Sequence, residues 1–424
     1  MHHWRYMKRV ATIASAALAV AGMTVAVGAS AQADESPAPA AADSHQWLTG
    51  YWHNFDNGST VMKLSEVPSA YNLIAVAFAD NHSDLSGGIT FNLESEELDG
   101  YTEREFKDDI ADIQEDGRKV IISVGGEKGN VVIDDATAAE NFADTTYELM
   151  EEYGFDGVDI DLEHGINAEY TSDALHQLRD KAGSDLIITM APQTIDYQYT
   201  SAPYYELTEN ISDILTIVNM QYYNSGSMAG CDDQIYSQGT PDFLAALACI
   251  QLEMDLRPDQ VGLGVPAVPD AAGGGYQPMS DVVKAVDCLE LGENCGNFEP
   301  EEAYGPIGGV MTWSINWDKT NNYELAEVFS ERLNIDGDWS APDPGDGNDD
   351  DGSDQDGSDE NGSDENGDAN ECSDIAAWNS GEIYTGGEEV SHDGDVWEAK
   401  WWTQGDAPGE GGEWGVWQNQ GSCD

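Results

Sequence analysis

Residues 155–163, with the sequence F-D-G-V-D-I-D-L-E, constrain the fold of this chain most strongly. Acidic and aliphatic residues alternate in this stretch, and successive side chains of a β-strand point to opposite faces. Asp159, Asp161 and Glu163 are therefore expected on one face of a strand whose other face is apolar. Carboxylates this close cannot all ionise freely, so at least one pKa should be raised, which suits a general acid. The alternative is a solvated edge strand in a very acidic protein.

The net charge of the chain excludes several classes of partner. Its 424 residues include 16 Lys and Arg against 82 Asp and Glu, which gives a formal net charge of −66. Recognition of nucleic acids needs basic patches, and anionic membranes would repel this surface. Disorder does not account for the charge, because 40% of the residues are hydrophobic and they form periodic segments. We expect a folded protein from a halophile, since a Debye length of roughly 3 Å in molar salt damps acidic self-repulsion.

The N-terminus has the pattern of an export signal. Basic residues precede the apolar run 10–27, and Ala29-Ser30-Ala31 follows as a cleavage site. The run is about the minimum length for a membrane span, but the adjacent small residues favour a removed signal peptide at 1–31. Residues 32–44 are expected to be disordered, and no other segment is apolar enough to span a membrane. The mature protein is therefore predicted to be secreted.

Six cysteines follow the signal, and an even number outside the cell favours disulfides. Six cysteines allow fifteen pairings. Proximity in the sequence and in the domains favours Cys231–Cys249, Cys288–Cys295 and Cys372–Cys423. A zinc site is the alternative, although no C-x-x-C or His-x-x-x-His spacing supports it. We predict no bound metal.

Eight strand-like runs indicate the fold class. Most are aliphatic and β-branched, as in strands buried on both faces, and helical or loop patterns separate them. They lie at 45–55, 71–80, 119–126, 155–163, 185–193, 214–224, 260–267 and 308–317. The alternation, with a clear amphipathic helix at Ala136–Tyr153, predicts an α/β fold with a (β/α)8 TIM barrel over residues 45–338. Glu163 ends the fourth run, and the chemistry of such barrels lies at these strand ends.

Several strand ends also carry side chains suited to a sugar. Aromatic rings stack on the apolar faces of pyranose rings, while polar groups bond the hydroxyls and amides. The substrate-binding candidates are Tyr51, Phe78, Met190, Gln221, Asn224 and Trp313. Packing in the core is the ordinary alternative for each aromatic residue alone. Their recurrence at the strand ends favours binding.

The acidic motif resembles the D-x-x-D-x-D-x-E signature of family 18 glycoside hydrolases, the chitinase family. Its positions here are Asp156, Asp159, Asp161 and Glu163. Further resemblances to the family lie at Ser123, Gly125 and Gly126 (S-x-G-G), at 221–223, and at Trp313. The resemblance covers residues 45 to about 335 and implies hydrolysis of β-1,4-linked N-acetylglucosamine polymers without a cofactor. The side chain of Asp156 is expected on the opposite face of the strand from Asp159, so we expect a structural role for it.

The resemblance implies a role for each residue of the site. Glu163 would protonate the leaving oxygen, and the acetamide carbonyl of the substrate would attack the anomeric carbon with retention. Asp161 would bond the acetamide N–H, and the buried Asp159 would share a proton with Asp161. Tyr223 would donate to the acetamide oxygen. Gln221 and Trp313 would hold the sugar ring, with Tyr51 and Phe78 as lesser candidates.

The expected activity is internal cleavage of chitin by a monomer. Residues 268–307, between the last two runs, leave no room for the α+β insertion that deepens the groove in some family members, so an open cleft is expected. Two alternatives use the same barrel. One is an endo-β-N-acetylglucosaminidase acting on N-glycans, and the other is a chitin-binding lectin, which typically lacks the acid.

The C-terminal part of the chain is predicted to be a linker and a small all-β domain. Residues 341–370 are acidic Gly/Ser/Asp repeats typical of an extended linker; a calcium-binding repeat is the alternative, but the EF-hand spacing is absent. Residues 371–424 hold more large aromatic residues than so small a core can bury. The stretch 399–405, A-K-W-W-T-Q-G, resembles chitin-binding modules of families 5 and 12. This resemblance implies chitin contacts by Trp401, Trp402 and Tyr384, while Trp378, Trp397 and Trp414 are expected in the core.

Overall fold

The chain divides into two compact units, Met1–Asp346 and Gly347–Asp424. The structure is a computed structural model that describes residues 46–254 and 256–335, and short segments between 378 and 422. No helix among these residues is long and apolar enough to cross a membrane. The predicted signal peptide at 1–31, the segment 32–44 and the linker at 341–370 lie outside the described residues.

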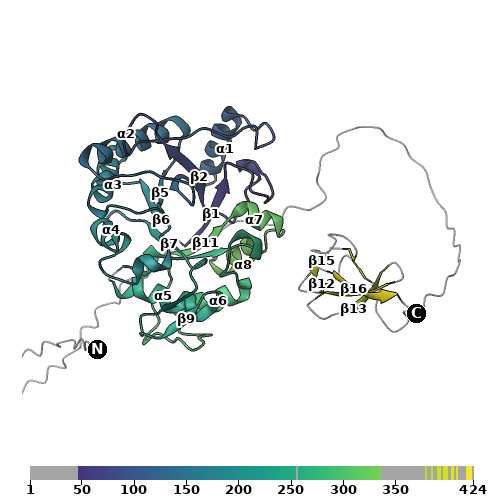
Figure 1. Ribbon diagram of the computed structural model, residues 1–424. Coiled ribbons are helices and arrows are strands. Elements are labelled where there is room, and N and C mark those ends of the chain that lie inside the picture. The colour runs from purple at the N-terminus through teal and green to yellow at the C-terminus, as the bar shows by residue number, and fades with distance from the viewer. Residues whose placement is uncertain are drawn as a thin grey trace, which may run out of the picture. The chain divides into compact units, whose positions relative to one another are not determined.

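A closed barrel of eight parallel strands forms the centre of the first unit (Figure 1). The first strand closes it, because Thr49 is paired with Met311 on one side and with Leu73 on the other. The strands, in spatial order, are β1 (Trp47–His53), β2 (Leu73–Asn81), β4 (Lys119–Gly125), β5 (Gly157–Asp161), β6 (Ile187–Met190), β7 (Ile217–Gln221), β10 (Val261–Pro266) and β11 (Gly309–Trp313). Each of the eight predicted runs overlaps one of these strands, so the predicted TIM barrel is confirmed. Outside the barrel, β3 (Ile89–Thr90) is paired with the end of β2, and β8 (Ser227–Ala229) with β9 (Ile235–Ser237).

Helices surround the barrel (Figure 1). They are α1 (Glu103–Glu115), α2 (Ala136–Tyr153), α3 (Ala168–Ala182), α4 (Pro203–Ile211), α5 (Pro241–Glu253), α6 (Met279–Leu291), α7 (Ile315–Thr320) and α8 (Glu324–Arg332). The predicted helix is α2, which begins where the Asp135 side chain accepts bonds from two backbone N–H groups and ends at the left-handed Gly154. The eighth run was predicted too long, because Ser314 caps α7 directly after β11.

Two apolar layers follow from the alternation of side chains along the barrel strands. The outer layer, between strands and helices, contains Val158 and Ile160 of β5. The inner layer fills the barrel and contains Tyr51 and Met311. Because β5 is paired on both sides, with β4 and β6, it is not an edge strand. The carboxylates of β5 therefore face the barrel interior, and the solvated-edge alternative is wrong.

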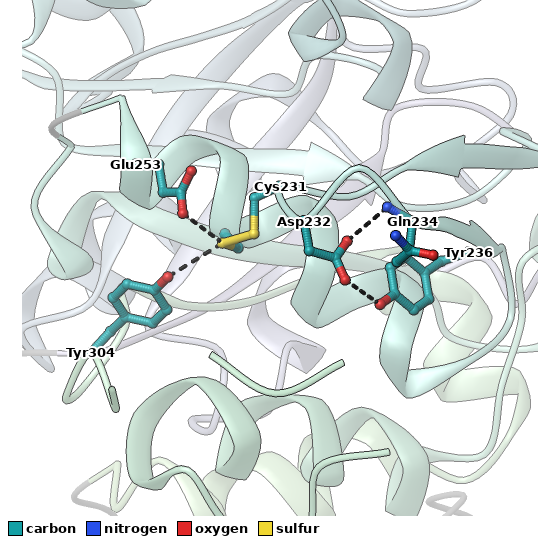
Figure 2. The surroundings of a disulfide bond; sticks show 7 residues. Cys231, Asp232, Gln234, Tyr236, Glu253 and Tyr304 are labelled. Atoms are coloured by element: carbon teal, nitrogen blue, oxygen red, sulfur yellow. Dashed lines mark hydrogen bonds between the residues drawn. A yellow bond between two sulfur atoms is a disulfide. The ribbon is translucent and has the colours of Figure 1, made fainter. Parts of the chain in front are cut away.

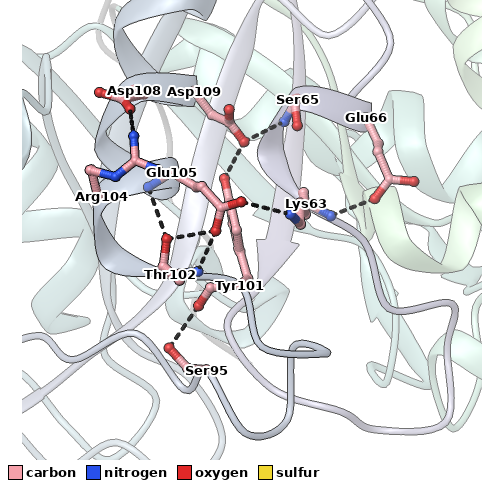
Figure 3. A network of polar contacts seen from close by, with 10 residues as sticks. All are labelled: Lys63, Ser65, Glu66, Ser95, Tyr101, Thr102, Arg104, Glu105, Asp108 and Asp109. Carbon is pink, nitrogen blue, oxygen red and sulfur yellow. Dashed lines mark hydrogen bonds and ion pairs between the residues drawn. The ribbon is translucent and has the colours of Figure 1, made fainter.

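Polar contacts fix the start of α1 against the short 3-10 helix Leu64–Glu66 (Figure 3). Thr102 and Glu105 form a capping box, in which each side chain bonds the backbone of the other. Lys63 Nζ donates to Glu105 at 3.2 Å, and Tyr101 donates to Asp109. These contacts join the start of α1 to the segment 63–66.

Two disulfides, Cys231–Cys249 and Cys288–Cys295, confirm the predicted pairings in the first unit. The first joins the segment after β8 to α5, and Tyr304 donates to its Cys249 sulfur at 3.3 Å (Figure 2). Glu253 lies beside the same sulfur, but sulfurs in a disulfide are not thiolates and offer no metal site. The predicted Cys372–Cys423 pair lies outside the described residues.

The second unit contains short antiparallel strands. Three of them, β13 (Glu389–His392), β14 (Asp395–Ala399) and β16 (Trp417–Ser422), form one sheet, and β12 (Ile383–Tyr384) is paired with β15 (Thr403–Gln404). Trp378 and Trp397 pack on the buried Val390 and Trp417, so both act in the core as predicted. Trp401, Trp402 and Trp414 lie outside the described residues, as does the side chain of Tyr384.

Candidate active site

Asp159 lies at the base of the site, inside the barrel. It is almost fully buried, and three hydroxyl groups donate to its carboxylate: Tyr51 at 2.8 Å, Ser123 at 2.6 Å and Thr189 at 2.6 Å. Burial raises the pKa of Asp159, while these hydrogen bonds oppose the rise. The three donors come from β1, β4 and β6, so the closed barrel is what brings them to one carboxylate.

Asp161 lies two residues further along the same face and is also buried. Gln221 Nε2 donates to its Oδ1 at 2.8 Å and to the carbonyl oxygen of Ala191 at 2.9 Å. Burial, followed by the charges of Asp159 and Glu163, raises the pKa of Asp161 well above its ordinary value. A buried carboxyl beside two others favours the protonated form, as the alternation in the sequence predicted.

Glu163 lies beyond the end of β5 and lines an open cleft. It is partly exposed, in contrast to the two aspartates, and Gln221 Nε2 lies 3.5 Å from its Oε1. Burial raises its pKa, and the Gln221 contact opposes this rise. A carboxyl that stays protonated at higher pH and reaches a cleft has the properties of a general acid.

The glycines of the S-x-G-G stretch let two backbones approach beside Asp161. The N–H of Gly126 donates to the carbonyl oxygen of Asp161 at 2.7 Å. A Cβ on Gly125 would lie 2.1 Å from the same oxygen, and Gly125 has φ 122°. Only glycine fits here, so this motif aligns β4 with the carboxylate strand.

Tyr223 lies two residues after β7 and lines the cleft together with Asp161 and Glu163. Burial, followed by the charges of Asp161 and Glu163, raises the pKa of its hydroxyl. It therefore stays protonated at neutral pH. Within the described part of the chain no hydrogen-bond partner of this hydroxyl is found, so it is free to donate to a ligand.

Aromatic rings form the floor of the cleft at the end of β11. Trp313 stacks with Phe78 at a centroid distance of 5.8 Å and lies 5.5 Å from Tyr51. His53 lies beneath it at 4.7 Å and stacks on Phe55. Burial lowers the pKa of His53 to about 3, so its ring is neutral beneath Trp313, and its Nδ1 lies 3.3 Å from Ser59 Oγ.

The cleft has a volume of about 990 Å³, at the upper end of the range of ligand pockets. Of the predicted site residues, those that line it are Tyr51, Phe78, Asp161, Glu163, Gln221, Tyr223, Asn224 and Trp313. Comparison with known proteins agrees with this arrangement. Residues 48–271 match the glycosyl hydrolases family 18. The chain belongs to this family.

Relatives of the family 18 domain come from several bacteria. Chitinase D of Niallia circulans is 36% identical over 76% of this chain and 66% of its own length, and Chitinase Chi52 of Paenibacillus xylanexedens is 35% identical over 68% and 62%. The chain thus spans less than two thirds of these two relatives. A crystal structure of a Streptomyces coelicolor protein assigned as chitinase A is 55% identical, with a TM-score of 0.68, over 69% of this chain and 99% of that one. Residues 377–418 match carbohydrate-binding module family 5/12, which agrees with the small all-β domain.

One predicted substrate contact of this family 18 domain is wrong. Met190 is fully buried in the outer apolar layer and does not line the cleft. Its neighbour Thr189 points inward and bonds Asp159. The side chain of Met190 therefore points to the other face of β6, toward the helices. The prediction placed it at the correct strand end but on the wrong face.

Two structural predictions around the carboxylate strand are resolved by the contacts. Asp156 accepts bonds from the N–H of Val120 and from Lys119 Nζ, both at 2.9 Å, so its structural role is confirmed. Asp159 contacts hydroxyl groups, and no hydrogen bond between Asp159 and Asp161 is found in the described residues. The coupling between the two aspartates is electrostatic.

The sequence reasoning missed several residues of the cleft because loops contribute them. The loop after β6 provides Ile195, the hairpin β8–β9 provides Met228, and the loop after β10 provides Asp270. The rule that barrel sites are built from the loops after the strands points to these segments. It does not identify which side chain in each loop faces the cleft.

Proposed function

We propose that this chain is a secreted chitinase that cleaves internal β-1,4 linkages of chitin with retention. The observation that carries the proposal is the arrangement around Glu163: a partly exposed carboxyl of raised pKa, two buried aspartates behind it, and the free hydroxyl of Tyr223 in the same cleft. Family 18 enzymes use substrate-assisted catalysis in place of a second carboxylate at the sugar.

The proposed reaction begins with proton transfer from Glu163 to the glycosidic oxygen. As that bond breaks, the acetamide oxygen of the substrate bonds the anomeric carbon and an oxazolinium ion forms. Asp161 accepts the acetamide N–H, and Tyr223 donates to the acetamide oxygen. The Glu163 carboxylate then takes a proton from water, which attacks the anomeric carbon and opens the ring with net retention.

The shape of the cleft supports internal cleavage. Residues 267–308, between β10 and β11, contain a 3-10 turn (Pro269–Ala271) and α6, and no strand. A wall that would close one end of the cleft is thus absent from this described segment. A polymer can therefore lie across the site with sugars on both sides of Glu163.

The second unit favours chitin over the alternative substrates. The match to carbohydrate-binding module family 5/12 fits an insoluble polymer, which gives an N-glycan-cleaving endo-β-N-acetylglucosaminidase less support. We also propose export after cleavage near residue 31 and a monomeric state. N-terminal sequencing of protein from the medium and light scattering test these two points.

The test of the proposed function is sugar release from colloidal chitin in molar salt. Glu163→Gln should lower release at least about 100-fold, because general acid catalysis is lost, while chitin binding is kept. Glu148→Gln, which removes one exposed carboxylate from α2, is the matched control and should keep full activity. Binding without release by the wild type would mean a lectin. Release from glycoproteins alone would mean an N-glycanase.

A further inference from the structure

The hydroxyl of Tyr223 is not fixed in the cleft by a hydrogen bond. Within the described residues this oxygen has no partner, although the side chain is 92% buried at a relative exposure of 8%. A donor has to lie within hydrogen-bond distance of the substrate atom that it stabilises. Its position therefore follows from the packing of the ring and from the main chain that carries the ring.

A glycine-rich loop runs beside this main chain. Residues 273–275, after β10, are three successive glycines. The N–H of Asn224, the residue after Tyr223, donates to the carbonyl oxygen of Gly274 at 2.9 Å. Gly273 lines the cleft itself. The loop thus reaches from the cleft to the backbone next to Tyr223.

Gly275 packs directly against Tyr223. A Cβ at Gly275 would lie 2.6 Å from the Cα of Tyr223, 2.9 Å from its Cβ, and 3.1 Å from the carbonyl oxygen of Tyr222. Two of these contacts are closer than real Cβ atoms come, and the atoms that they meet belong to Tyr223. Gly275 also has φ 101°, which L side chains rarely adopt. Only glycine allows the loop to approach this closely.

Two other loops hold the segment 223–225. Ser225 Oγ donates to the carbonyl oxygen of Tyr223 at 2.8 Å, and Thr194 Oγ1, from the loop after β6, donates to Ser225 Oγ at 2.8 Å. Gln238, directly after β9, accepts the N–H of Ser225 on its Oε1 at 2.6 Å. A methyl group added at Gly275 would therefore push against a segment that these contacts hold in place.

We propose that Gly275 is a positioning residue for Tyr223, because its close approach sets where the Tyr223 hydroxyl meets the acetamide oxygen of the substrate. This inference rests on the proposed chitinase function. Gly275 acts through the main chain of Tyr223. A displacement of about 1 Å in a group that stabilises the transition state can lower the rate about 100-fold.

The experiment measures steady-state kinetics of the full-length protein on the N-acetylglucosamine hexasaccharide. Gly275→Ala should lower kcat at least about tenfold and change KM less than about twofold, because the hydroxyl acts where charge develops in the transition state. The same substitution in Tyr223→Phe should lower kcat less than about twofold, since no hydroxyl is left to misplace. A structural defect elsewhere would lower kcat equally in both backgrounds.

Gly117→Ala is the matched control. Gly117 precedes β4, whose other end reaches the cleft at Gly125. Gly117 also has a positive φ, 83°, but a Cβ there would meet nothing within 4 Å. This variant carries backbone strain without the clash, so its kcat should equal that of the wild type.

Gln238→Ala provides the test if Gly275→Ala does not fold. It removes the acceptor of the Ser225 N–H and adds no atoms to the loop, so it loosens the segment 223–225 without a clash. In that case kcat should fall about threefold to tenfold in the wild-type background and less than about twofold in Tyr223→Phe. Unchanged kcat in Gln238→Ala would then overturn the proposal.

The outcomes separate this inference from the proposed function. No hydrolysis of the hexasaccharide by the wild type would contradict the chitinase itself. In an active enzyme, wild-type kcat in Gly275→Ala would overturn the positioning role. An equal loss in the wild-type and Tyr223→Phe backgrounds would also overturn it, because the substitution would then act on Glu163 or on the cleft as a whole.

Discussion

At the scale of single residues, the site depends on which polar groups lack a partner inside the protein. Asp159 has three hydroxyl donors, and Asp161 has Gln221. The hydroxyl of Tyr223 faces the cleft between them and has no such bond in the described residues. Interactions made inside the protein hold the carboxylates, and the remaining donor is available for the acetamide.

Tyr223→Phe should therefore lower kcat by about 10- to 100-fold with little change in KM, because the lost donor acts where charge develops in the transition state. The measurement is steady-state kinetics on a soluble chitin oligosaccharide. Tyr222→Phe is the matched control, since the Tyr222 hydroxyl accepts a bond from Gln251 in the outer layer. Equal losses in both variants would contradict the role of Tyr223.

His53 should make the stability depend on pH. Its pKa is about 3 in the folded protein against an ordinary value of 6.5, so below pH 6.5 the unfolded chain takes up a proton that the folded protein does not. Stability is therefore lost as the pH falls from about 6.5 toward 3, by at most about 1.4 kcal/mol per pH unit. His53→Phe should remove this contribution to the slope of unfolding free energy against pH. Denaturant unfolding at several pH values measures that slope. Equal pH dependence of the unfolding free energy in the variant and the wild type would refute this role of His53.

At the scale of elements, the buried carboxylates of β5 lower the stability of the folded protein. Its inward face brings Asp159 and Asp161 into a barrel interior that also contains apolar residues such as Ala75 and Ile217. A closed barrel gives these carboxylates no route to bulk water except the cleft. The strand is therefore less stable than one with neutral side chains in the same places.

Asp161→Asn should consequently raise the melting temperature at pH 7 while it abolishes most of the activity. The pKa of Asp161 is raised in the folded state, so its contribution to stability falls as the pH rises above the unfolded pKa of about 3.9. The rise in melting temperature should be larger at pH 7 than at pH 4, at about 2 °C for each kcal/mol of added stability. Thermal melts at the two pH values measure it.

Asp156→Asn, directly before the same strand, is the contrasting variant. Asp156 bonds Lys119 Nζ and the Val120 N–H, so its substitution should lower stability by about 1 kcal/mol. A melting temperature of Asp161→Asn below that of the wild type at pH 7 would contradict the argument for β5.

At the scale of the whole molecule, the negative charge dominates. Most basic side chains among the described residues are paired, as in Arg332 with Asp287 and Glu290 at 2.8 Å, and Lys319 with Glu66 at 2.7 Å. Such pairs neutralise only a small part of a formal charge of −66. The remaining carboxylates repel one another over the surface of the folded protein.

Stability should therefore increase with salt, since the Debye length falls from about 10 Å at 0.1 M to about 3 Å at 1 M. We expect the melting temperature to rise steadily between 0.1 M and 2 M NaCl. Sucrose at matched osmolality is the control, because it does not screen charge. An equal melting temperature at both salt concentrations would argue against adaptation to molar salt.

The sequence alone determined the features that depend on near neighbours along the chain. A period of two placed Asp159, Asp161 and Glu163 on one side of a strand, and aliphatic runs between helical segments predicted the barrel. Proximity identified the pairs Cys231–Cys249 and Cys288–Cys295. Each of these inferences requires only the geometry of one element or a short loop.

The tertiary structure alone decided which face of each strand points inward and what meets there. Met190 was assigned to the cleft because it ends a strand, but the barrel turns Thr189 inward in its place. The contacts of Asp159 with Tyr51 and Ser123 join residues far apart in the sequence, and the same is true of His53 beneath Trp313. Closure of the barrel creates these contacts, and alternation along a single strand carries no information about what lies across it.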